Sequence, residues 1–163
     1  MNHFLGGILL LSLAGCATAP LFQNNITPKQ ESTVESDRYA RGWEKLKEID
    51  GHAGERVIEA LKDTSPDLAR YTIEFPFGDV YSRGVLSLKE REIATVAALT
   101  ALGNAQPQLK VHIHGALNVG CTRQEIIEVM IQMAVYAGFP AALNGTLAAK
   151  EVFAERDKAG QSN

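Results

Sequence analysis

The stretch HIHGALNVGCTRQEIIEVMIQMAVYAGFPAALNG, residues 112–145, decides the fold of this chain. Gly120 ends one helical segment, and the residues Thr122 to Glu125 form a capping box that starts the next. Gly138 ends that second segment, and Pro140 suits the first turn of a third. No part of the stretch alternates apolar and polar residues as a half-buried strand does. The stretch therefore predicts three consecutive helices.

The same pattern continues toward the N-terminus. Ser87-Leu88-Lys89-Glu90 is a second capping box, and the segment behind it is nearly apolar all round and ends at Gly103, which predicts a buried central helix. Further helices are expected after Asp37 as N-cap, around residues 55–62, and from residue 66 until Pro76 and Gly78 interrupt the pattern. The predicted fold class is all-α, a compact bundle of six to seven helices.

Composition sets limits on the kind of protein. The chain has 163 residues, a formal charge of -3 and 45% hydrophobic residues, which suits one globular domain. It has no dense Lys/Arg block after the first third of the chain, so nucleic acid is not expected as a partner. Its two cysteines have no Cys-x-x-Cys or Cys/His spacing, so we predict no metal site and no disulfide framework.

The N-terminus is typical of an export signal. Residues 4–14, FLGGILLLSLA, are too few to span a bilayer but suit the apolar part of a signal peptide. Leu13-Ala14-Gly15-Cys16 resembles a bacterial lipobox, which predicts cleavage before Cys16 and a lipid anchor on its thiol. Ala17, in place of an aspartate, favours the outer membrane, facing the periplasm. Cleavage after Ala19 would instead give a soluble periplasmic protein.

These patterns divide the chain into four parts. Residues 1–19 are the predicted signal peptide, 20–36 a flexible linker, 37–157 the domain, and 158–163 a polar tail.

His112 is the main candidate for chemistry. It lies beside the apolar stripe of its helix and is expected to lean inward, whereas His114, two residues on, faces away. An imidazole there could act as a general acid or base, or it could be a hydrogen-bonded core histidine. Glu92 could orient His112, and Arg91 could bind a substrate carboxylate. Alternatively, Glu92 is simply favoured near the start of its helix.

Cys121 has two possible roles. It stands just before the Thr122 cap, where an apolar residue packs against the helix as a staple, and Ile126 is its expected partner. A helix N-terminus can also lower the pKa of a thiol and make it reactive.

Three segments together resemble the carboxymuconolactone decarboxylase family. They are residues 112–145, the upstream segment FGDVYSRGVLSLKEREIATVAALTALG at 77–103, and RYARGWEKLKEIDG at 38–51. The resemblance covers about residues 38–155 and implies the alkylhydroperoxidase D-like fold. Thiol peroxidases of this superfamily carry Cys-x-x-Cys ahead of a histidine, and with that histidine at His112 the two positions hold Ala105 and Gln108.

The resemblance implies a decarboxylase that needs no cofactor, with a small molecule as its partner. It places His112 and Glu92 in the catalytic site, and Arg91 or Arg83 would hold a substrate carboxylate. It also implies a homo-oligomer, a trimer or a hexamer. Three functions remain open: decarboxylation of an unsaturated lactone or a related acid, peroxide reduction, and ligand binding without catalysis.

Overall fold

The computed structural model describes residues 34–161. The predicted signal peptide, Cys16 and most of the predicted linker lie outside the described residues, so the predictions made for them stay predictions. Within 34–161 the chain forms only helices, which confirms the all-α class: α1 (Val34–Asp50), α2 (Ala53–Leu61), α3 (Pro66–Thr72), the π-helix η1 (Ile73–Tyr81), α4 (Leu88–Leu102), α5 (Gln106–Asn118), α6 (Arg123–Tyr136) and α7 (Phe139–Lys158).

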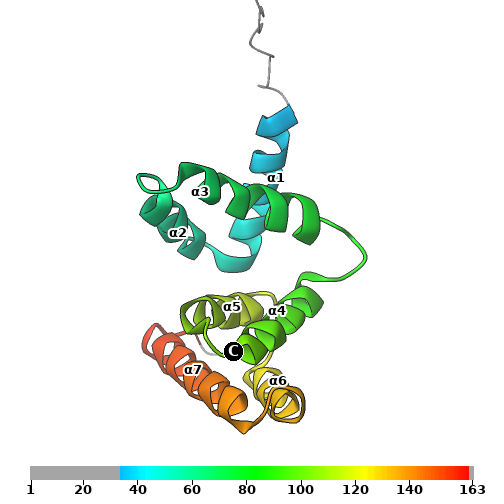
Figure 1. Ribbon diagram of the computed structural model, residues 1–163, viewed down its shortest axis with the longest axis vertical. Helices are drawn as coiled ribbons and strands as arrows, with labels where there is room; N and C mark the ends of the chain where they lie inside the picture. Colours follow the sequence, from blue (N-terminus) through cyan, green and yellow to red (C-terminus); the bar gives the residue numbers. More distant parts are fainter. Residues whose placement is uncertain (1–33, 162–163) are drawn as a thin grey trace, which may run out of the picture. The chain divides into compact units, whose positions relative to one another are not determined.

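The helices of the described domain lie in two groups (Figure 1). One group holds α1, α2, α3 and η1, and the other holds α4 to α7. Helix α5 joins the groups because it packs against α1 on one side and against α4 and α7 on the other. Each group has its own apolar core, one around Ile73 and Ile49 and the other around Ile113 and Met130. The boundary between the groups, along α5, is therefore where a cavity can form.

The two capping boxes predicted from sequence are confirmed. The Ser87 and Thr122 side chains each accept a hydrogen bond from the backbone N–H three residues later, and Glu90 and Glu125 accept bonds in return. Gly103 ends α4 with a φ of 70°, a left-handed conformation that favours glycine. These local signals fix where α4 and α6 begin and where α4 ends.

Two predicted helix ends are wrong. Helix α1 begins at Val34, so Asp37 lies within it and is not its N-cap. Pro76 and Gly78 do not end the helix, because residues 73–81 continue α3 as a π-helix with Pro76 inside it. A π-helix bonds each N–H to a carbonyl five residues back, which changes the register at the point where proline lacks its N–H.

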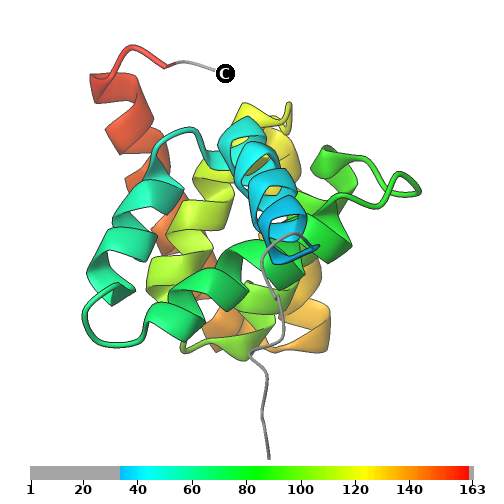
Figure 2. The same ribbon diagram turned by 90° about the horizontal axis from the view of Figure 1, so that it is seen from above.

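Helices α1 and η1 are in close contact. Figures 1 and 2 show the two helices side by side. A Cβ at Gly42 of α1 would lie 2.3 Å from the Ile73 carbonyl oxygen, and one at Gly78 would lie 2.6 Å from the Arg38 carbonyl oxygen. The side chain of Arg38 also pairs with Asp79 of η1. Two glycines therefore let the two backbones touch.

Helix α4 is less buried than its composition predicts. Its buried side chains are Glu92, Val96 and Thr100, which follow one another at four-residue spacing along one face. Leu102, on another face, is 65% exposed. The expectation of a helix buried all round is therefore wrong for this single chain. Among residues 34–161, no helix is both long and apolar enough to span a bilayer.

Candidate functional site

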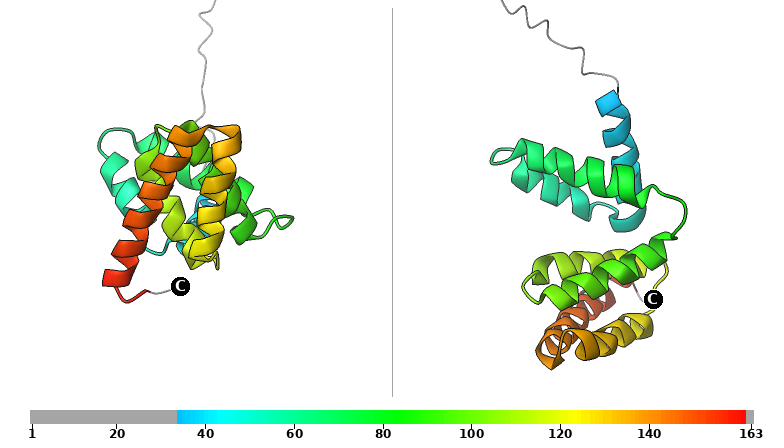
Figure 3. Two further views of the ribbon diagram at one scale, coloured as in Figure 1. Left: turned by 90° about the horizontal axis from the view of Figure 1, so that it is seen from below. Right: turned by 45° about the vertical axis from the view of Figure 1, so that its right-hand side comes forward.

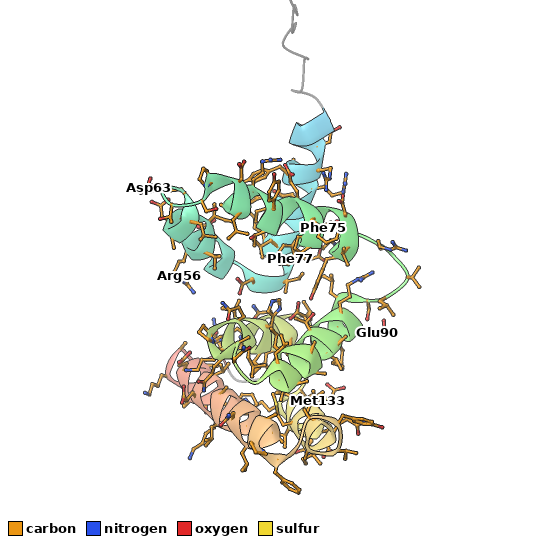
Figure 4. All side chains as sticks on the ribbon, in the orientation of Figure 1. Arg56, Asp63, Phe75, Phe77, Glu90 and Met133 are labelled. Carbon is orange, nitrogen blue, oxygen red and sulfur yellow. The ribbon has the colours of Figure 1, made fainter. Side chains whose placement is uncertain are left out.

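A cavity of about 250 Å³ lies at the boundary between the two groups of helices. Its wall is mainly apolar, with side chains such as Leu46 from α1, Ile58 from α2 and Val111 from α5. Phe77 of η1 also lines it and points toward the α4–α7 group (Figure 4). Four polar side chains reach the wall, namely Asp50, Thr72, Gln108 and His112. A small apolar ligand with few polar groups matches this wall.

His112 lines the cavity, and its ring is hydrogen-bonded to Glu92. Its Nδ1 lies 2.9 Å from Oε2 of Glu92, and because a carboxylate only accepts hydrogen bonds, Nδ1 is the protonated donor. This leaves Nε2 as the nitrogen that can exchange a proton with a ligand. The structure thus brings together His112 and Glu92, two of the residues that the sequence analysis selected.

Glu92 is fully buried on α4, which is unusual for a carboxylate. Room for it comes from Gly115 of α5, because a Cβ at this glycine would lie 3.3 Å from Oε2 of Glu92 and 2.9 Å from Ile49. The other oxygen of Glu92, Oε1, has no hydrogen-bond partner among the described residues. Burial and the charge of Glu92 raise the pKa of Tyr81 nearby.

Asp50 is a site residue that the sequence analysis missed. It is the last residue of α1, is only 8% exposed and lines the cavity. Burial raises its pKa to about 6, while the charges of His112 and Arg56 act in the opposite direction. One signal could have identified it, since a helix C-terminus disfavours a negative charge, and an acid there suggests a specific reason.

Arg91 and Arg83 lie outside the cavity wall. The guanidinium of Arg91 donates a hydrogen bond of 2.9 Å to the backbone carbonyl of Arg83 and lies 5.8 Å from the ring centre of Tyr81. The structure brings the two arginines to each other but not to His112. Their role in binding a substrate carboxylate stays a prediction.

Cys121 is packed in the apolar core of α4 to α7. It is 2% exposed, and burial raises the pKa of its thiol to about 11. Ile126 belongs to the same core cluster. These observations match the staple and not the reactive thiol, because the thiolate is the nucleophilic form.

Comparison with known proteins gives a consistent result. Residues 66–151 match the carboxymuconolactone decarboxylase family. The chain is 33% identical to the 4-carboxymuconolactone decarboxylase of Acinetobacter baylyi over 120 residues, which cover 73% of this chain and 89% of the relative.

Two further relatives match a smaller part of this chain. An uncharacterized 15.0 kDa protein of Paracoccus denitrificans is 33% identical over 62% of this chain and 76% of its own length. The nitrosuccinic acid decarboxylase of Metarhizium robertsii is 30% identical over 57% of this chain and 66% of its own length. Two of these three relatives are thus named as decarboxylases, for two different acids.

Proposed function

Because the chain belongs to the carboxymuconolactone decarboxylase family, we propose that it is a decarboxylase acting without a cofactor on an unsaturated lactone or a related carboxylated small molecule. The observation that carries this proposal is the pair of His112 and buried Glu92 at the wall of an apolar cavity. The different acids in the names of two relatives support the type of reaction more than any one substrate.

The proposed reaction needs only a conjugated substrate and a proton. When the bond to the carboxyl carbon breaks, CO₂ leaves and the electron pair moves through the double bond to the lactone carbonyl. A C–H bond then forms at the substrate carbon, which consumes one proton. An apolar cavity favours this step because the charge of a carboxylate spreads out as CO₂ departs, and water stabilises the starting carboxylate most strongly.

His112 is the proposed proton donor. With Nδ1–H bonded to Glu92, a proton on Nε2 can pass to the substrate carbon and leave a neutral imidazole. Glu92 has a positioning role, because its hydrogen bond to Nδ1 fixes the orientation of the ring. The arrangement resembles other acid–base histidines that a carboxylate orients.

The test measures CO₂ release by the full-length chain from carboxymuconolactone and from simpler unsaturated lactone acids. We expect His112→Gln to lower the rate by roughly a hundredfold or more. His114→Gln is the matched control, since His114 is on the same helix, is absent from the cavity wall and contacts Glu155 at 3.2 Å. It should keep the rate within about twofold. Absence of CO₂ release from every acid, or an unchanged rate in folded His112→Gln, would overturn the proposal.

We also propose that the protein is exported and that a lipid on Cys16 anchors it to a bacterial membrane facing the periplasm. The support is the sequence LAGC at residues 13–16 behind an apolar segment. Metabolic labelling with a radioactive fatty acid should mark the wild-type chain and not Cys16→Ser. Label on both variants, or on neither, would contradict the anchor.

A further inference from the structure

The proposed chemistry leaves one buried acid of the cavity without a role. Asp50 is more than nine-tenths buried at the end of α1, and both of its carboxylate oxygens lack a hydrogen-bond partner among the described residues. Asn118 of α5 holds the adjacent turn of backbone, because its amide donates a 2.9 Å hydrogen bond to the carbonyl of Ile49. The backbone at Asp50 is therefore fixed, and the backbone N–H of Gly54 lies close enough to the carboxyl group to lower its pKa, without a hydrogen bond of normal geometry.

The charges around Asp50 do not suit a simple carboxylate ligand. His112 of α5, Glu92 of α4 and Arg56 of α2 are the charged or titratable groups that act on it. Arg56 is exposed and extends from α2 toward the α4–α7 group (Figure 4). No lysine or arginine is among the described residues that line the cavity. An ionised Asp50 would repel a ligand carboxylate, and this wall holds no lysine or arginine to offset the repulsion.

We propose that Asp50 binds the carboxyl group of the ligand as a neutral acid, so that a carboxylate ligand enters the cavity together with one proton. The protonated Asp50 then donates its O–H to an oxygen of the ligand carboxylate, a short hydrogen bond of the kind that two carboxyl groups sharing one proton make. This inference rests on the proposed function and specifies its substrate class.

The substrate class that follows is a small acid with an apolar, unsaturated body that turns one carboxyl group toward Asp50. Asp50 can offer one proton to one carboxylate, and the described wall holds no lysine or arginine for a charged one. The proton also fits the balance of the reaction. A carboxylate that loses CO₂ consumes one proton, which His112 donates, and the proton that enters with the ligand equals the one that His112 must regain before the next turnover.

The experiment is calorimetric titration of the full-length protein with γ-carboxy-γ-butyrolactone. This saturated acid has a ring and a carboxyl group but no conjugated double bond, so it binds without reacting. Titrations at about pH 7.5 in two buffers with different heats of ionisation report the protons taken up per ligand. Because the pKa of Asp50 is about 6, it is mostly ionised at that pH in the free protein. We expect nearly one proton taken up, and nearly none with the neutral methyl ester.

The variants assign the proton to a residue. Asp50→Asn should abolish the uptake and make the affinity for the acid nearly independent of pH, whereas the wild-type affinity falls about tenfold per pH unit above the pKa of Asp50. His112→Gln should retain the uptake. The proposal is overturned if the acid fails to bind, if wild type takes up no proton, or if uptake is lost in His112→Gln and kept in Asp50→Asn.

The outcome is separable from that of the proposed function. Proton-linked binding that depends on Asp50, without CO₂ release from any unsaturated acid, would leave the binding site valid and the decarboxylase proposal wrong. CO₂ release without proton uptake at Asp50 would support the decarboxylase proposal and overturn the proposed role of Asp50.

Discussion

At the scale of single residues, Asp50 is expected to lower the stability of the fold at neutral pH. Its pKa is about 6 in the fold, against 3.8 for an unperturbed aspartate, and the main cause is burial. Between these two values the folded state binds more protons than the unfolded state, so stability falls as the pH rises through this window. The difference corresponds to at most about 3 kcal/mol, which partial solvation reduces.

The corresponding prediction concerns Asp50→Asn. At about pH 7.5 this variant should be more stable than wild type by about 1–2 kcal/mol, because the amide carries no buried charge. The gain should shrink toward about pH 4.5, where the folded wild type holds a neutral acid. Urea unfolding at both pH values measures this, with exposed Asp63→Asn as the control. A less stable Asp50→Asn at neutral pH would contradict the assignment of a buried, unpaired charge.

Cys121 should behave as a structural residue in solution. Its raised pKa and its 2% exposure predict that a thiol reagent leaves it unmodified in the native protein and labels it after unfolding in urea. Cys16→Ser provides the background in which Cys121 is the one remaining thiol. Rapid labelling of the native protein, or thiol-dependent peroxide reduction that Cys121→Ser abolishes, would favour a peroxidase instead.

At the scale of helices, the contact between α1 and η1 should tolerate no added methyl group. In Gly42→Ala the new Cβ would meet the backbone carbonyl of Ile73 at 2.3 Å, and backbone cannot rotate away as a side chain can. We expect a loss of about 1–3 kcal/mol despite the better helix propensity of alanine. Gly84→Ala is the matched control, since a Cβ there has no neighbour within 4 Å. Equal stability of the two variants in urea would show that the helices can move apart.

The sequence predicts helix ends well where the signal is local. Ser87 and Thr122 were identified correctly because a capping box is made entirely by residues within one turn. The π-helix was missed because Pro76 is typical of a helix break, and the packing of η1 against α1 leaves no local pattern in the sequence.

The same distinction holds for the candidate site. His112 was selected from its phase on one helix, and the alternative in which Glu92 orients His112 is matched by a contact of 2.9 Å. Asp50 was missed because its burial comes from α2 and α5 folding over the end of α1, which no local pattern records. Arg91 and Arg83 were selected for their charge alone, and charge does not tell which way a side chain faces.

At the scale of the whole molecule, α6 and α7 expose an unusual amount of apolar surface. The two helices lie side by side (Figure 3). Each carries large apolar side chains at four-residue spacing that are more than half exposed: Ile131 and Val135 on α6, and Phe139, Leu143 and Leu147 on α7. Large apolar side chains exposed in such stripes on two neighbouring helices are typical of a contact surface when they lie together. We propose that further copies of this chain cover these stripes, because closed symmetric assemblies of one chain are the commonest way in which a soluble subunit buries such a surface.

The prediction is that the wild-type chain forms a homo-oligomer, a trimer or a hexamer, and that Leu143→Glu breaks it into smaller species. Leu143 is 61% exposed in the single chain, so the fold of the subunit should tolerate a charge at this position. In a covered interface the same charge would be buried without a partner. Val85→Glu is the matched control, because Val85 is 88% exposed and lies outside α6 and α7. Size-exclusion chromatography with light scattering gives the mass, and circular dichroism checks the helices. A monomeric wild type, or a Leu143→Glu variant that keeps the wild-type mass, would show that another molecule covers this face or that it stays in contact with water.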